Sequence, residues 1–212
     1  MSQYNIIAST TESTVVAEYT PGTRRSDGYQ SEAQLEKEFI RLLCEVGYTY
    51  LPIHTEADLV ANLRTQLEKL NNYQFTDGEW ERFFQQSIAN TNEGIKEKTR
   101  RIQDGDTAQA FKRDSGESKN IRLLDKKCIH NNTLQVINQY TVSQAEGAAH
   151  DNRYDVTILV NGLPLVHVEL KRRGVAIREA FNQINRYQRD SFWAASGLFE
   201  YVQIFVISNG TH

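Results

Sequence analysis

Residues 152–171 read NRYDVTILVNGLPLVHVELK, and this stretch decides the fold of the chain. Two runs rich in β-branched and aliphatic residues flank an Asn-Gly dipeptide at 161–162, which is typical of tight turns in β-hairpins. The sequence therefore predicts two antiparallel strands. Asp155 lies on the first strand, and Glu169 and Lys171 lie on the second, with thirteen residues between the two acids.

The register of this hairpin decides whether the two acids meet. A plain two-residue turn would pair Asp155 with Val168. Glu169 would then point to the opposite face, because side chains alternate along a strand. In that register no cation could be shared between the two carboxylates.

The apolar pattern favours a different register. The apolar faces of the two strands coincide only if the numbers of paired residues add up to an even value. A three-residue loop at 161–163 meets this condition, with Val160 opposite Pro164 and Asp155 opposite Glu169. We therefore expect a bulged or longer turn that brings the acids together.

The residue types at these positions point to a metal-dependent nuclease. Two carboxylates, with the backbone carbonyl of Leu170, are oxygen ligands that Mg²⁺ accepts. A cation beside a lysine is what hydrolysis of a phosphodiester requires, because the metal stabilises developing charge and acidifies a bound water. Lys171 would orient or help deprotonate that water, so Asp155, Glu169 and Lys171 are the candidate catalytic residues. The alternative is an ordinary polar hairpin face with a surface Glu and Lys.

Composition and charge set further bounds. The chain has 212 residues, enough for one domain, and its 39% hydrophobic and 24% charged residues are ordinary for a soluble protein. No apolar run approaches the roughly 18 residues of a membrane span, and the N-terminus has no secretory signal. We expect a cytoplasmic protein with no membrane partner. A net charge of −3 argues against binding of DNA by bulk electrostatics.

Basic residues are nevertheless concentrated after the hairpin. The segment 169–190 has six basic residues against three acids. A basic patch beside an acidic metal site would attract phosphate, although such a run also forms ordinary solvated helix faces. The basic residues are Lys171, Arg172, Arg173, Arg178, Arg186 and Arg189.

The rest of the chain alternates between helical and strand patterns, which predicts an α/β domain with a mixed sheet. Residues 1–30 look polar and irregular and are expected to form an extended or edge segment, and 104–119 looks like a polar loop or insertion. We expect helices at 31–47, 56–70, 77–89, 93–103 and 175–190, and strands at 48–53, 133–142 and 201–207. No glycine-rich phosphate loop of the ATP-hydrolysing kind occurs.

Residues 152–192 closely resemble the nuclease region of the restriction subunit of type I restriction-modification enzymes of the IC-like group, and 31–53 and 203–211 are similar to it too. The resemblance implies a PD-(D/E)xK fold, a central mixed β-sheet flanked by helices, which uses Mg²⁺ to cut double-stranded DNA. The motif's acids correspond to Asp155 and Glu169 and its lysine to Lys171. Its proline is replaced by Tyr154.

The resemblance also implies supporting residues. Gln183 and Tyr187 match a Q-x-x-x-Y element and share one helix face, from which they would reach DNA or the surroundings of the lysine. Glu36 corresponds to a first-helix glutamate that either leans toward the metal or faces solvent. Arg172, Arg173, Arg178 and Arg186 are the candidate DNA contacts.

As implied by the resemblance, 1–212 would be a single nuclease domain at the N-terminus of a longer subunit. The longer protein would add a motor that uses ATP, and would assemble with methyltransferase and specificity subunits. Two alternatives stay open. One is a free-standing resolvase or repair nuclease, and the other is a DNA-binding or assembly domain that no longer cuts.

Overall fold

A computed structural model describes residues 3–9, 15–20, 31–105, 107–143, 148, 151–172 and 177–209. Its centre is a five-stranded sheet of order β3-β6-β7-β8-β9. The β3–β6 and β8–β9 pairs are parallel, whereas β6–β7 and β7–β8 are antiparallel, so the expected mixed sheet is confirmed. The strands are β3 (Thr49–Tyr50), β6 (Leu134–Val142), β7 (Asn152–Val160), β8 (Leu163–Leu170) and β9 (Ile204–Ser208).

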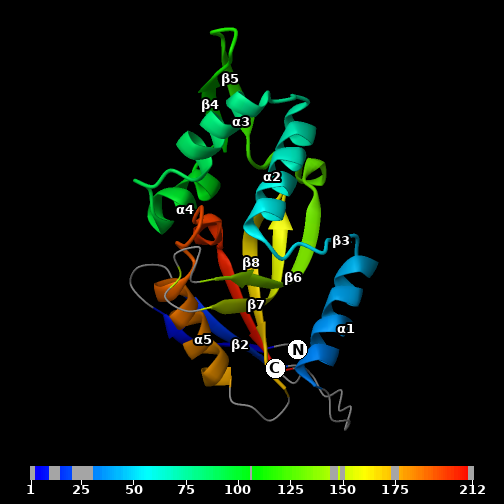
Figure 1. Cartoon of the computed structure of the whole chain (residues 1–212). Helices are drawn as coiled ribbons and strands as arrows, with labels where there is room; N and C mark the ends of the chain where they lie inside the picture. Colours follow the sequence, from blue (N-terminus) through cyan, green and yellow to red (C-terminus); the bar gives the residue numbers. More distant parts are fainter. Residues whose placement is uncertain are drawn as a thin grey trace.

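Helices α1 (Glu32–Glu45) and α5 (Ile177–Asp190) flank the lower half of this sheet, one on each side (Figure 1). Ser31 caps α1, because its hydroxyl accepts from the backbone N–H of Gln34, and the side-chain oxygen of Gln34 accepts from the backbone N–H of Ser31. The buried contact between α1 and the sheet is formed by Val136, Val156, Val168 and Leu170, with Leu35, Phe39, Ile40 and Leu43 from the helix. The expected α/β layering is therefore present.

A second group of elements, residues 56–122, forms what we call the distal lobe, at the upper end of the molecule in Figure 1. Its core contains the rings of Phe75, Phe83 and Phe111, which lie 5.3 to 5.6 Å apart. The elements are α2 (Glu56–Asn71), α3 (Asp77–Phe83), the π-helical turn η1 (Phe84–Ile88), α4 (Ile95–Gln103), β4 (Ala108–Lys112) and β5 (Ser118–Arg122).

One prediction is wrong in the distal lobe, and another is confirmed only in part. The segment 104–119, predicted as a loop or insertion, contains β4 and the start of β5, which form an antiparallel hairpin. Each of these strands buries one residue, Phe111 or Ile121, so the sequence shows no alternating pattern. The single helix predicted at 77–89 changes at Phe84 from α- to π-helical geometry.

The β7–β8 hairpin follows neither of the two simple registers. Next to the turn, Val160 pairs with Leu163, so the turn has two residues and the expected pairing of Val160 with Pro164 is wrong. Beyond Ile158 the register shifts by one residue, and Val156 pairs with Val168 as expected. Leu165 is the extra residue, so the bulge lies within the strand and not in the turn.

The turn itself is buried under the distal lobe. Asn161 and Gly162 both have positive φ, 50° and 83°, as a type I′ turn requires. Asn161 is only 1% exposed, and its side chain bonds the backbone of Thr133 and Leu123. A Cβ on Gly162 would lie 2.6 Å from Cα of Leu63 on α2, so only glycine fits there.

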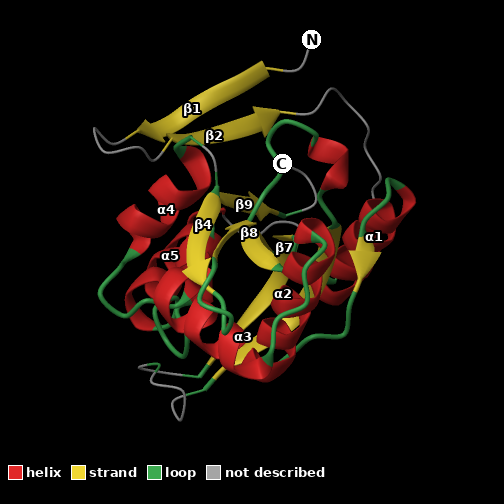
Figure 2. Cartoon of the chain, turned by 90° about the horizontal axis from the view of Figure 1, so that it is seen from above, coloured by secondary structure: helices red, strands yellow, loops and turns green. Residues whose placement is uncertain are grey.

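The ends of the chain also differ from expectation. Residues 1–30, predicted to be irregular, contain the antiparallel pair β1 (Gln3–Ser9) and β2 (Val15–Thr20), outside the central sheet in Figure 2. The expected extended backbone is present in these two strands, but their pairing was not predicted, although their β-branched and aromatic residues carry a strand signal. The strand predicted at 201–207 begins only at Ile204, after the 3₁₀ turn η4 (Leu198–Tyr201), and it is an exposed sheet edge.

Two smaller points complete the fold. The predicted strand 48–53 is reduced to the two residues of β3, and a short 3₁₀ turn, η2 (Ile129–Asn131), precedes β6. No helix among the described residues combines the length and apolarity that a membrane crossing requires.

Candidate active site

The structure brings Asp155 and Glu169 together on neighbouring strands. Each acid is the residue next to the pair Val156 and Val168, and the charge of Glu169 acts on Asp155, so the shifted register is the one that the acids need. Oδ2 of Asp155 accepts a hydrogen bond from the backbone N–H of Leu170 at 2.9 Å. In extended backbone the N–H and C=O of one residue point to the same side, so the carbonyl of Leu170 also faces β7. Asp155 is therefore in direct contact with the backbone of Leu170, and the role of the Leu170 carbonyl as a ligand stays a prediction.

Lys171 lies directly beside the acid pair. Its Nζ is 2.9 Å from Oε1 of Glu169, which is completely buried, while the lysine side chain stays 15% exposed. The ammonium thus neutralises part of the acid charge and keeps contact with solvent. The alternative of an exposed polar hairpin face is contradicted, because Glu169 is not at the surface.

The electrostatics of the site disfavour a second negative charge. Burial, and then the nearby charge of Glu169, raise the pKa of Asp155 to about 7. The hydrogen bond from Leu170 and the charge of Lys171 lower that pKa without cancelling the rise. The two carboxylates therefore repel each other at neutral pH, and a bound cation would relieve this repulsion.

Glu36 leans toward the site from α1. Both of its carboxylate oxygens accept hydrogen bonds from side-chain amides on β6, one from Asn138 and one from Gln139. Its charge is among the causes that raise the pKa of Asp155. Gln139 has a φ of +53°, which is unusual for a residue other than glycine. These two amides were missed from the sequence, where only a polar pair inside an alternating strand marks them.

Gln183 and Tyr187 face the same site from α5. The side-chain amide of Gln183 donates to the hydroxyl of Tyr187, which donates in turn to the carbonyl of Arg153 at 3.0 Å. Burial, and then the charge of Glu169, raise the pKa of Tyr187 to about 12. The tyrosine is therefore a neutral hydrogen-bonding group beside the acids, and its ring is buried.

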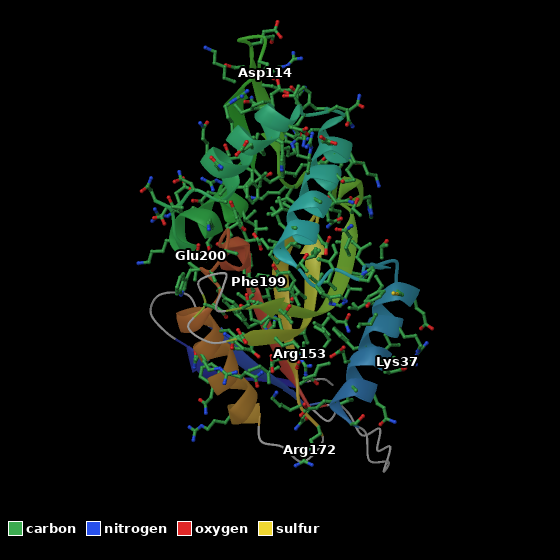
Figure 3. The ribbon with its side chains drawn as sticks, viewed as in Figure 1. Lys37, Asp114, Arg153, Arg172, Phe199 and Glu200 are labelled. Carbon is green, nitrogen blue, oxygen red and sulfur yellow. The ribbon has the colours of Figure 1, made fainter. Side chains whose placement is uncertain are left out.

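The predicted basic residues are only partly described. Arg172, Arg178 and Arg186 are exposed, and the guanidinium of Arg186 lies over the ring of Tyr187 at 5.5 Å. Arg172 donates its backbone N–H to Glu32. Arg173 lies outside the described residues. Figure 3 places Arg153 and Arg172 in the lower half of the molecule, at the opposite end from Asp114 on the distal lobe.

The donor set fits a hard divalent cation. It consists of two carboxylates and one carbonyl, and Oε2 of Glu169 is buried with no hydrogen-bond partner in the described part of the chain. Within the described ranges, no three His, Cys, Asp or Glu side chains form a metal cluster by themselves. The oxygens of Asp155, Glu169 and Leu170 are the ligand type that Mg²⁺ prefers, with water completing its coordination.

Comparisons with known proteins give one consistent result. Residues 29–212 match the family model described as type I restriction enzyme R protein N terminus. The chain is 48% identical over 206 residues to the type I restriction enzyme EcoprrI endonuclease subunit of Escherichia coli, which covers 97% of this chain and 64% of that relative. It is 41% identical over 187 residues to the SsaAORF53P endonuclease subunit of Staphylococcus saprophyticus, covering 86% of this chain and 19% of the relative. The chain thus spans less than two thirds of the length of either relative.

Proposed function

This chain belongs to the family of type I restriction enzyme R protein N-terminal domains, and from that premise we propose that it is a Mg²⁺-dependent endonuclease domain of the PD-(D/E)xK type. Its substrate would be double-stranded DNA, and its reaction the hydrolysis of a phosphodiester bond. The relatives are named endonuclease subunits, which supports this assignment.

One observation carries the proposal. The buried Glu169 and the partly buried Asp155 repel each other and lie beside a lysine, in the part of the hairpin that has the shifted register. A structural hairpin gains nothing from two facing carboxylates, since like charges opposite each other in a sheet destabilise it. The arrangement is understandable if a cation occupies the space between them.

Each residue of the candidate site would then have a distinct role. Asp155, Glu169 and the carbonyl of Leu170 would hold Mg²⁺, with Glu36 as a third nearby acid. The cation, when bound, supplies Lewis acidity at the scissile phosphate. Lys171 would orient the attacking water and stabilise the charge that develops on the phosphate oxygens.

The DNA would approach over α5. Arg178 and Arg186 are exposed on this helix, on the same element as Gln183 and Tyr187, which face the acids. Exposed arginines beside a buried acidic site attract the phosphate backbone, and contacts of this kind position DNA without reading its sequence. We therefore expect little sequence preference from this domain alone.

The chain spans only part of its relatives, so the activity of the whole enzyme is part of the proposal. We infer that cutting depends on ATP through a motor elsewhere in the longer protein, and that methyltransferase and specificity subunits complete a cytoplasmic complex. Both relatives are named as subunits, which supports a multi-subunit assembly.

Calorimetric titration with Mg²⁺ and Mn²⁺ tests the cation site. Wild type should bind, and Asp155→Ala should bind at least about tenfold more weakly, since one of two carboxylate ligands is lost. The matched control is Asp114→Ala, an exposed acid at the tip of the distal lobe. Equal binding by wild type and Asp155→Ala would overturn the proposed site.

A further inference from the structure

His167 is a polar side chain in an apolar pocket. The imidazole is completely buried, and neither ring nitrogen has a hydrogen-bond partner among the residues that the structure describes. The ring packs against Tyr154, Tyr187 and Phe192, with centroids 5.3 to 6.0 Å away. A phenylalanine would fill such a pocket, whereas a buried polar group without a partner destabilises the fold. The imidazole therefore calls for a role other than packing.

The polar group that the imidazole approaches is Glu169. Nε2 of His167 lies 3.4 Å from Oε2 of Glu169, in an orientation that makes no hydrogen bond. Oε2 itself is buried without a partner, while Oε1 is held by Lys171 at 2.9 Å. One oxygen of this carboxylate is thus fixed, and the other faces an unused donor.

We propose that His167 is a positioning residue for Glu169. The Nε2–H of His167 donates to Oε2 of Glu169 when that carboxylate turns to hold a cation. This inference rests on the cation site of the proposed function. A neutral imidazole has one N–H to donate, and a hydrogen bond to the free oxygen fixes the carboxylate plane. Loss of such a supporting bond typically weakens metal affinity about 10- to 100-fold.

Three variants separate positioning from packing. His167→Phe keeps the aromatic ring and removes the donor. His167→Gln keeps an amide N–H that can reach the same oxygen. Thr157→Val is the matched control, because Thr157 lies directly across from His167 and also has a buried hydroxyl without a partner.

Mn²⁺ affinity of the 212-residue chain is measured by calorimetry, beside thermal unfolding of each variant. We expect His167→Phe to bind about 10- to 100-fold more weakly while unfolding no earlier than wild type. His167→Gln should stay within about threefold of wild type, and Thr157→Val should be unchanged. Wild-type affinity in His167→Phe, or equal losses in His167→Phe and Thr157→Val, would overturn the proposal.

A spectroscopic readout covers the case in which His167→Phe does not fold. In ¹⁵N NMR of the wild-type chain, the Nε2 resonance of His167 should shift at a Mg²⁺ concentration that saturates wild type, and it should shift less in Asp155→Ala at the same concentration. An unchanged resonance in a wild type that binds Mg²⁺ overturns the role of His167 alone. If wild type and Asp155→Ala bind alike, the cation site fails first, so the two failures are distinguishable.

Discussion

The backbone N–H of Leu170 donates to Oδ2 of Asp155 at 2.9 Å, and this bond ties the two strands together at the point where the acids meet. It stabilises the ionised form of Asp155, but burial and the charge of Glu169 outweigh it and raise the pKa to about 7. Asp155 therefore titrates in a range where its unfolded counterpart, near 3.8, is already ionised.

The raised pKa predicts that the cation-free domain loses stability as pH rises. Between about pH 4 and about pH 7 the folded chain holds a proton on Asp155 that the unfolded chain releases, so the free energy of unfolding falls by at most about 1.4 kcal/mol per pH unit. Asp155→Asn removes this dependence. Urea denaturation of both proteins in EDTA across this range measures it, and a pH-independent difference between them would contradict it.

Replacing Lys171 should make cation binding more dependent on pH. The charge of Lys171 lowers the pKa of Asp155, so in Lys171→Met that pKa rises further and protons compete more strongly with the cation. Mn²⁺ calorimetry at several pH values should show the onset of binding displaced to higher pH. Lys171→Arg, which keeps the charge, is the control, and an unchanged onset in Lys171→Met would refute the expectation.

Gly162→Ala should destabilise the domain by about 2 to 5 kcal/mol. The φ of +83° costs a side chain about 1 to 2 kcal/mol, and overlap of the new Cβ with Leu63 adds about 1 to 3 kcal/mol. Gly116 has a φ of +87° with nothing within 4 Å of its Cβ position, so Gly116→Ala isolates the conformational part. If urea denaturation showed the same loss in free energy of unfolding for Gly162→Ala and Gly116→Ala, the close contact with Leu63 would be ruled out.

Removing the exposed arginines of α5 should weaken DNA binding and reduce its salt dependence. Each phosphate contact contributes about 0.9 to the slope of log affinity against log salt. Arg178→Ala and Arg186→Ala together are expected to lower that slope by up to about 2. Fluorescence anisotropy with a DNA duplex checks this against Lys112→Ala, an exposed cation of the distal lobe. A slope equal to that of wild type would exclude this face.

The core of the site was predictable because its signals are local. The alternation of apolar residues fixes which faces of β7 and β8 coincide, and that alone sets Val156 opposite Val168. In the same register, Thr157 pairs with His167. Far from the turn, the pairing of β7 with β8 follows from the need to bury the apolar faces of both strands on the same side of the sheet.

The remaining features depend on contacts between distant segments. The turn was predicted to be longer because nothing in its own sequence reveals the docking of Gly162 against Leu63. The amides that hold Glu36 come from about 100 residues away in the sequence, on β6, and require Gln139 in a left-handed conformation. Hairpin β4–β5 was missed because it buries too few residues to produce an alternating pattern.

The bulge at Leu165 also determines which changes in length the hairpin can accept. With a two-residue turn, two residues lie opposite each other only when an even number of residues stands between them. Thirteen residues stand between Asp155 and Glu169. Leu165 is the odd residue, so its deletion leaves the pairing of Val156 with Val168 and the neighbouring acids in place. Deletion of Val166 or His167 gives the same count between the acids, but only if Leu165 moves into the ladder and a side chain that is paired in the present sheet is lost. Length variation among related chains is therefore expected to collect at this one position.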